Sequence, residues 1–428
     1  MVLPYTEVEF DKKGRLTNPQ QVGDAGELFD GEKATDVIVL THGWNNDTAT
    51  ARALYRDIMS SLEGVRGKVA RAKGRRFVVV GLIWPSILWA PPDHEGQGAG
   101  AGIGDEADEL RELIEQQVEQ PSRRDALIAL IPSLETSASV RAEFVDLLRT
   151  DLPAGAVDDA DPDSAPEALK TADAETLFAA AGGGPALSGA PEEAGGAAGL
   201  GAFEFGEEEG GAAGFSLSGL LGAARSIVNI TTYYTMKERA GVVGAKGIAK
   251  LLEQLHATTP GVRLHLVGHS FGGRAVTAAA DATNAPVSSM CLLQAAYSHY
   301  GMAQGWDGAQ ADGVFARVPG RVAGPIVVTF TRNDKAVGLA YPVASRIARQ
   351  VGVGLGDAND KYGGIGRNGA LKTPASLPFG TLLDVGGEYV FQPGRVSSLD
   401  GDRFISGHSD IAGRQVAYAV LTAATTVD

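Results

Sequence analysis

Cysteine is nearly absent from this chain, because Cys291 is the only one among 428 residues and no internal disulfide bond can form. Cys291 lies in an apolar stretch, a pattern that favours a small buried side chain. No group of His, Cys, Asp and Glu has the spacing of a metal site. Residues 357–360 (Asp-Ala-Asn-Asp) resemble a calcium loop only loosely, because the closing Glu is missing. We therefore expect no metal centre and no cofactor.

Long apolar runs are also missing, and none approaches the ~18 residues that a transmembrane helix requires. Residues 1–20 are polar and contain no hydrophobic signal core. We expect a cytoplasmic protein, with export by a signal-independent route as the alternative. Basic residues are few, since 37 Lys and Arg face 52 Asp and Glu. Without a basic patch, nucleic acid is not an expected partner.

Most of the net negative charge lies in one segment, residues 151–214. This segment holds fourteen acidic residues and one lysine, and the net charge of the whole chain is −15. It is rich in Ala and Gly and has few large apolar residues. Such a composition buries too little apolar surface to offset the entropy of ordering, so we predict a disordered acidic loop. A basic protein is the partner that such a loop would attract.

What the chain does contain is a serine in an informative setting. An apolar run, residues 264–267, leads into Gly268-His269-Ser270-Phe271-Gly272, and an Ala-rich helical run follows. Because 57 residues are glycine, the G-x-S-x-G pattern alone is expected roughly 0.4 times by chance. The strand before it and the helix after it are more specific, because a strand-to-helix turn presents a hydroxyl for attack. We interpret Ser270 as a catalytic nucleophile.

Elimination among the seven histidines favours His408 as the general base. His408 lies in a small-residue loop near the C-terminus, where a surface histidine is the alternative interpretation. Three of the others lie on or beside strand patterns: His42, His265 and His269. His94 lies in an insertion, His256 lies at the end of a helix, and His299 precedes the candidate acid in the chain. A neutral imidazole takes the proton from the serine during attack and returns it to the leaving group.

The candidate acid is Asp334, which follows an apolar strand pattern over residues 325–331. A buried carboxylate there would hold the imidazole in the required tautomer and stabilise the imidazolium. A structural alternative is that Asp334 caps a helix over residues 336–349. Three other residues are alternative acids: Asp384, Asp400 and Asp402.

An oxyanion needs two backbone donors, and the N–H groups of Phe271 and Trp44 are the candidates. Phe271 follows the nucleophile, and Trp44 follows an apolar strand, residues 36–41, that ends in His42-Gly43. Preorganised donors of this kind are worth on the order of 3 kcal/mol each. The alternative is an ordinary turn at a strand end. His42, Gly43 and His269 are candidate substrate-binding residues because they lie next to these groups in the sequence.

Taken together, four motifs resemble the α/β-hydrolase superfamily: Leu40-Thr41-His42-Gly43, Gly268-His269-Ser270-Phe271-Gly272, Asn333-Asp334 and Gly407-His408. The resemblance covers residues 30–90 and 226–428 and implies an α/β-hydrolase fold, a mostly parallel sheet flanked by helices. It also implies a Ser-Asp-His triad and cofactor-free hydrolysis of esters or related acyl bonds. No subfamily is indicated, so the substrate stays open among small-molecule and lipid esters.

The domain organisation follows from these assignments. Residues 1–90 and 226–428 form the catalytic domain, in which residues 5–10 and a turn at Lys13-Gly14 predict an antiparallel edge hairpin. Residues 91–150 are predicted to be a helical insertion, either a cap over the site or a side domain. Its apolar stripes are Leu110, Leu113, Ile114 and Val118, then Val140, Phe144, Leu147 and Leu148.

Two apolar segments have alternative interpretations. Residues 215–225 begin an apolar helix, which is either a lipase-like lid or a helix packed on its own domain. Trp84, Leu88 and Trp89 would either line an acyl pocket or anchor the insertion. The function that these predictions favour is a serine esterase that works through an acyl-enzyme. The alternatives are a lipase or phospholipase with an interfacial lid, and a non-catalytic scaffold that binds a partner through the acidic loop.

Overall fold

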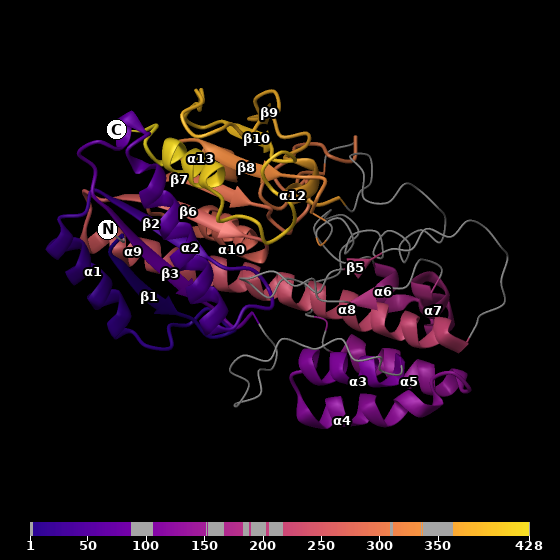
Figure 1. The fold of residues 1–428 in the computed structure, drawn as a ribbon. Helices are drawn as coiled ribbons and strands as arrows, with labels where there is room; N and C mark the ends of the chain where they lie inside the picture. The colour runs from indigo at the N-terminus through magenta and orange to yellow at the C-terminus, as the bar shows by residue number, and fades with distance from the viewer. Residues whose placement is uncertain are drawn as a thin grey trace.

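The computed structural model describes residues 3–86, 106–150, 152, 167–182, 188–189, 203–204, 217–308, 311–334, 336 and 363–427. At its centre is an eight-stranded sheet of order β1-β3-β2-β6-β7-β8-β10-β9, in which all neighbouring strands are parallel (Figure 1). The strands are β1 (Tyr5–Glu9), β2 (Asp36–Thr41), β3 (Phe77–Ile83), β6 (Arg263–His269), β7 (Val287–Leu293), β8 (Ile326–Phe330), β9 (Gly380–Thr381) and β10 (Val396–Asp400). The predicted α/β class with a parallel sheet is confirmed.

Both faces of the sheet are covered by helices, as strands with continuous apolar sequences require. In β2, Val37 and Val39 face a core shared with α1 (Gln20–Glu32), α9 (Ala249–Thr258) and α10 (Phe271–Ala282). The alternate residues Ile38 and Leu40 face a second core shared with α2 (Thr48–Arg66) and α13 (Arg414–Ala424). The period of two along the strand therefore divides the apolar side chains between two layers.

The N-terminal edge differs from the prediction. β1 pairs in parallel with β3, and the expected antiparallel hairpin is reduced to one isolated bridge between Phe10 and Leu16. The chain turns at Gly14, which has a φ of 73°. After the turn it enters α1, so no returning strand is left to pair with β1. The hairpin prediction was wrong because the pattern showed a strand and a turn but not the strand's partner.

A helical group surrounds the N-terminal part of α8 (Leu217–Val242), beside the sheet (Figure 1). It contains α3 (Glu106–Gln117), α4 (Pro121–Leu130), α5 (Ala138–Arg149), α6 (Glu167–Thr171) and α7 (Ala174–Gly182). The predicted stripes are largely buried, with Leu110, Ile114 and Phe144 at 0% exposure. Helical structure in this insertion is thus confirmed over the described residues, and whether the group covers the site stays a prediction.

Part of the segment predicted to be disordered is folded. Residues 167–182 form α6 and α7, in which Leu177 and Phe178 are each 1% exposed. The Phe178 ring lies 6.5 Å from the ring of Phe144 in α5. The prediction failed here because average composition hides a short apolar face that a neighbouring helix can bury. Strands β4 (Ser188–Gly189) and β5 (Phe203–Glu204) form a small antiparallel pair, and the rest of residues 153–214 lies outside the described residues.

α8 connects the helical group to the sheet. Its first turns are packed, since Leu221 and Ala224 are buried in the same core as α7. This supports the packed interpretation of the predicted apolar helix, although Phe215 and Ser216 lie outside the described residues. At its other end α8 continues through a π-helical segment, Val243–Ile248, into α9. Among the described helices, none is long and apolar enough to cross a membrane.

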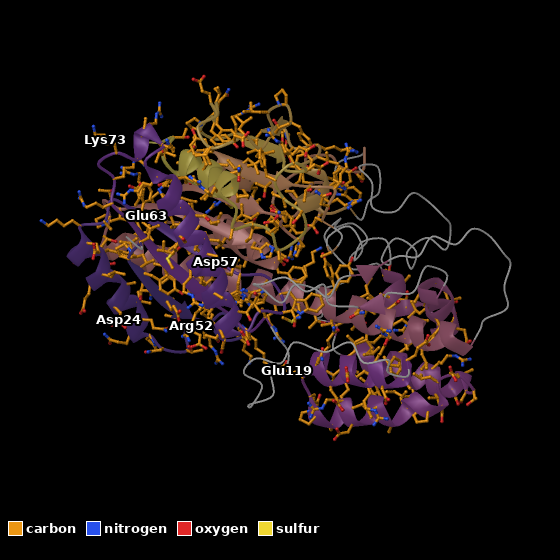
Figure 2. The ribbon with its side chains drawn as sticks, viewed as in Figure 1. Asp24, Arg52, Asp57, Glu63, Lys73 and Glu119 are labelled. Carbon is orange, nitrogen blue, oxygen red and sulfur yellow. The ribbon has the colours of Figure 1, made fainter. Side chains whose placement is uncertain are left out.

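Charged side chains join the helical group to the part of the chain that contains the sheet. Glu119, labelled in Figure 2 between the two parts, forms ion pairs with Lys12 at 2.9 Å and with Arg239 of α8 at 3.1 Å. The guanidinium of Arg239 also donates to the carbonyl oxygen of Pro85 at 3.1 Å. The base of the helical group is therefore attached to the segment that follows β3.

Candidate active site

The nucleophile candidate lies at a sharp turn between β6 and α10. Ser270 has φ 55° and ψ −125°, a conformation that L-residues rarely adopt. The turn depends on its glycines, because a Cβ on Gly268 would lie 2.4 Å from the carbonyl oxygen of Gly272. A Cβ on Gly272 would lie 2.3 Å from the carbonyl oxygen of Thr41, at the end of β2. The G-x-S-x-G pattern is thus required by close backbone approach on both sides of the serine.

Asp334 and His408, far apart in the sequence, are hydrogen-bonded at the same edge of the sheet. Asp334 follows β8 and is fully buried, and its Oδ2 lies 2.8 Å from Nδ1 of His408. A carboxylate only accepts, so the imidazole Nδ1–H is the donor. Nε2 of His408 is buried and has no hydrogen-bond partner among the described residues. The lone pair on Nε2 is therefore available to accept a proton.

His269 connects His408, the candidate base, to Ser270, the candidate nucleophile. Its Nε2–H donates to the carbonyl oxygen of His408 at 2.9 Å, and the centroids of the two rings are 4.8 Å apart. Burial, together with the neighbouring His408, lowers the pKa of His269 to about 3. His269 therefore stays neutral. Its position supports the loop of His408, and its predicted contact with substrate stays a prediction.

The loops that carry Asp334 and His408 are tied together by the neighbouring Asp402. Its Oδ1 accepts from the hydroxyl of Thr331 and from the N–H of Arg332, both at 2.8 Å. The side-chain amide of Asn333 donates to the carbonyl oxygen of Ile405 at 2.8 Å. Asp402, an alternative acid in the sequence, thus serves to join the loops.

The other alternative acids also have different partners. Asp400 accepts from the N–H of Asp402 at 2.9 Å, and Asp384 forms a surface ion pair with Arg403 at 3.2 Å. Of the four carboxylates considered, the structure places Asp334 against His408. The helix that Asp334 was alternatively expected to cap, over residues 336–349, falls almost entirely outside the described residues.

The loop after β2 lies directly against Ser270. A Cβ on Gly43 would lie 2.6 Å from Cβ of Ser270 and 3.1 Å from its Oγ. The ring of Trp44 lies 6.0 Å from the ring of Phe271, and both rings contact Tyr233 of α8. The two residues proposed as oxyanion donors are therefore neighbours, next to Ser270. Tyr233 has no signal in the sequence that connects it to this site.

His42 has a structural role and does not face substrate. Its ring is fully buried and stacked on Trp84 at 5.5 Å. Nδ1 lies 2.9 Å from the carbonyl oxygen of Gly43, and Nε2 accepts from the N–H of Trp84 at 3.3 Å. Burial lowers the pKa of His42 to about 4, so the ring is neutral with its proton on Nδ1. The prediction that His42 contacts substrate was wrong, because both ring nitrogens are used within the framework.

Trp84 anchors the same loop. Its indole N–H donates to the carbonyl oxygen of His42 at 3.0 Å and its side chain is buried, which supports the anchoring interpretation. Leu88 and Trp89 lie outside the described residues. The hydroxyl of Tyr55 in α2 accepts from the N–H of His42 at 2.9 Å and donates to the carbonyl oxygen of Leu82 at 2.6 Å. Sequence reasoning missed Tyr55 because its partners come from two separate strands.

Two further residues of this loop framework were also missed, Asn46 and Ser86. The N–H of Asn46 donates to the hydroxyl of Ser86 at 3.1 Å, and this hydroxyl donates to the carbonyl oxygen of Asn46 at 2.8 Å. The N–H of Asn45 donates to the carbonyl oxygen of Ser86 at 3.0 Å. In the sequence, Asn45 and Asn46 directly precede Asp47, the N-cap of α2, and they indicate only a turn.

Within the described part of the chain, no three His, Cys, Asp or Glu side chains are grouped so that they could hold a metal ion. The loosely calcium-like residues 357–360 are outside it. Comparisons with family models, with curated proteins and with solved structures found no match to this chain.

Proposed function

We propose that this chain is a serine hydrolase of the α/β-hydrolase superfamily that cleaves carboxylic esters through an acyl-enzyme. The observation that carries the proposal is the 2.8 Å hydrogen bond between His408 Nδ1 and buried Asp334, which leaves Nε2 without a partner beside the Ser270 turn. A sheet with parallel strands supports it, because the residues after β6, β8 and β10 meet at the carboxyl edge.

The reaction begins when Oγ of Ser270 attacks the ester carbonyl carbon and its proton passes to Nε2 of His408. Asp334 stabilises the resulting imidazolium. The carbonyl oxygen becomes an oxyanion, which accepts from the N–H groups of Trp44 and Phe271. When the C–O bond to the leaving group breaks, His408 returns the proton to the departing alcohol. Water then attacks the acyl-enzyme with the same base, releasing the acid and restoring Ser270.

The substrate is a small-molecule or lipid ester with an apolar part. The support for this is Trp44, one of the proposed donors, whose ring is half-buried and packs on the buried rings of Tyr233 and Phe271. Large planar side chains offer apolar surface to an acyl or alcohol group. The experiment separates two alternatives. One is a lipase or phospholipase with an interfacial lid, and the other is a non-catalytic scaffold that binds a basic partner.

The test is labelling with a fluorophosphonate probe, together with hydrolysis of activated esters of increasing acyl length. The wild type is expected to label and to turn over, Ser270→Ala to lose labelling, and His408→Ala to label much more slowly. A sharp rise in rate above the aggregation point of a long-chain ester would favour the lipase alternative. If the folded wild type neither labels nor hydrolyses any ester, the enzyme proposal is wrong and the scaffold becomes the working hypothesis.

A further inference from the structure

We propose that Asn46 is a positioning residue for this reaction, because its side-chain amide sets the orientation of the peptide between Gly43 and Trp44. This inference rests on the proposed function of the Ser270 site. In this role Asn46 does not contact the reacting atoms and acts through the N–H group of Trp44.

The argument starts from the planarity of the peptide bond. In a trans peptide, the carbonyl of one residue and the N–H of the next point in opposite directions. Whatever fixes the carbonyl oxygen of Gly43 therefore also fixes the direction of the Trp44 N–H. This oxygen has two side-chain donors, Nδ2 of Asn46 at 3.2 Å and Nδ1 of His42 at 2.9 Å.

The two donors hold the carbonyl on the side away from substrate. His42 and Asn46 are 0% and 7% exposed and belong to the framework beneath the loop. On the other side, the Cα of Gly43 lies against Ser270, so close that a Cβ would be 2.6 Å from the serine Cβ. With its carbonyl held toward the framework, the peptide directs the Trp44 N–H to the side where an ester carbonyl meets the nucleophile.

The orientation of the Asn46 amide follows from its partners. Nδ2 also donates to the carbonyl oxygen of Trp44 at 2.9 Å. Because carbonyl oxygens only accept, the atom that faces both of them must be the NH₂ group. One amide thus bridges two successive carbonyls, and it fixes the peptides on both sides of Trp44.

The side-chain oxygen of Asn46 indicates that the orientation of this amide does more than stabilise the fold. Oδ1 of Asn46 is buried and has no hydrogen-bond partner within the described residues. Buried acceptors are nearly always satisfied, and an exception calls for an explanation. Here the unsatisfied oxygen accompanies an NH₂ group that holds two carbonyls next to the nucleophile. The backbone of Asn46 is in turn held by Ser86 at 3.1 and 2.8 Å, so the amide has a firm support.

The test compares Asn46→Ala and Asn46→Asp with the wild type. Asp has the size of Asn but presents no NH₂ group, so it separates the donor from the volume of the side chain. The readouts are kcat and KM for a short activated ester, and the inhibition constant of an aryl trifluoromethyl ketone. Such a ketone adds the serine hydroxyl and forms an oxyanion like that of the reaction. Active-site titration with the fluorophosphonate gives rates per folded site, so partial unfolding of a variant does not affect the comparison.

We expect both variants to lose about 10- to 100-fold in kcat and in ketone affinity, with KM nearly unchanged, since a misdirected donor weakens only the oxyanion contact. Thr283→Ala is the matched control, because Thr283 is also buried and lies at the far end of α10, where its hydroxyl donates to the carbonyl oxygen of Ala249 and accepts from the N–H of Ala285, at 3.1 Å each. It is expected to lower stability but to leave kcat and ketone affinity per site unchanged.

Other outcomes overturn the inference. Equal ketone affinity in Asn46→Asp and wild type would show that the NH₂ group does not orient the donor. A loss confined to KM, or a loss of the same size in Thr283→Ala, would make Asn46 a general structural residue. An inactive, unlabelled wild type would instead contradict the proposed function, and this inference with it.

Discussion

The side chain of His269 donates a hydrogen bond to the backbone carbonyl of His408 at 2.9 Å. The residue before Ser270, the proposed nucleophile, therefore holds the backbone of His408, the proposed general base, although one ends a strand and the other lies on a loop distant in sequence. This contact connects the turn after β6 with the loop after β10. It also places a second imidazole ring 4.8 Å from the first.

Removal of that hydrogen bond is expected to slow catalysis without abolishing it. His269→Phe keeps a planar ring but loses the donor, so the His408 loop is free to shift. We expect kcat/KM to fall about 10- to 100-fold, while fluorophosphonate labelling goes to completion more slowly. In the wild type, the pKa of His269 at about 3 keeps this ring neutral, so ionisation of His269 should not contribute to the pH dependence of kcat/KM above pH 5. An ionisation above pH 5 that is lost in His269→Phe would contradict this assignment.

Gly43 is expected to tolerate no side chain. In Gly43→Ala the new methyl group would lie 2.6 Å from Cβ of Ser270, so either the loop or the nucleophile must move. We expect a loss of about 100-fold or more in kcat/KM on an activated ester. The matched control is Gly64→Ala within α2, where a Cβ meets nothing within 4 Å. The control should retain activity and gain about 0.5–1 kcal/mol of stability from helix propensity. Equal activity in both variants would remove Gly43 from the site.

Stability should fall as the pH drops below neutrality. The pKa of His42 is lowered to about 4 in the fold, against about 6.5 in the unfolded chain. The folded ring is neutral, so its contribution is fully present above pH 6.5 and is lost as the pH falls from 6.5 to 4, where the unfolded chain alone binds the proton. The loss from His42 is about 3 kcal/mol.

Urea denaturation at several pH values measures this loss. His269, whose pKa is lowered to about 3, and His265, whose pKa burial also lowers, add to the wild-type slope in the same direction. His42→Gln should be less stable at pH 7 and should have a shallower pH dependence by about one proton. An unchanged slope in this variant would mean that His42 is not held neutral in the fold.

A buried ion network at the opposite end of the sheet should affect stability alone. Asp36 is fully buried and accepts from Arg75 at 3.0 Å, from Arg263 at 2.8 Å and from His265 at 3.1 Å. Asp36→Asn removes the negative charge that faces two buried or partly buried guanidinium groups, so it should cost about 3–5 kcal/mol of unfolding free energy. Activity per titrated site should not change, because Asp36 begins β2 while Ser270 follows the far end of β6.

The control for this network is Asp281→Asn, whose partner Arg317 is 75% exposed. A surface ion pair contributes little, so a change within about 1 kcal/mol is expected. If Asp36→Asn were no more destabilising than this control, the network would not stabilise the fold.

Much of the sheet and its covering helices could be predicted because their signals are local. The strand predicted over residues 36–41 coincides with β2, and the strand pattern over residues 325–331 contains β8. The motif around Ser270 likewise specified a strand-to-helix turn, since glycines at fixed offsets leave the backbone few alternatives. Predictions failed where the outcome depended on a partner, as in the parallel pairing of β1 and the folding of α6 and α7.

By itself, the sequence determined the parallel α/β class, the strand and helix at the nucleophile, and a short set of polar residues for the site. Periodicity and glycine spacing encode these features within a few residues. Only the tertiary structure decided which carboxylate meets His408, that His42 is a buried support, and that Asn46 and Ser86 hold the loop beside Ser270. These contacts join residues up to 74 positions apart, and a hydrogen bond between distant groups leaves no pattern along the chain.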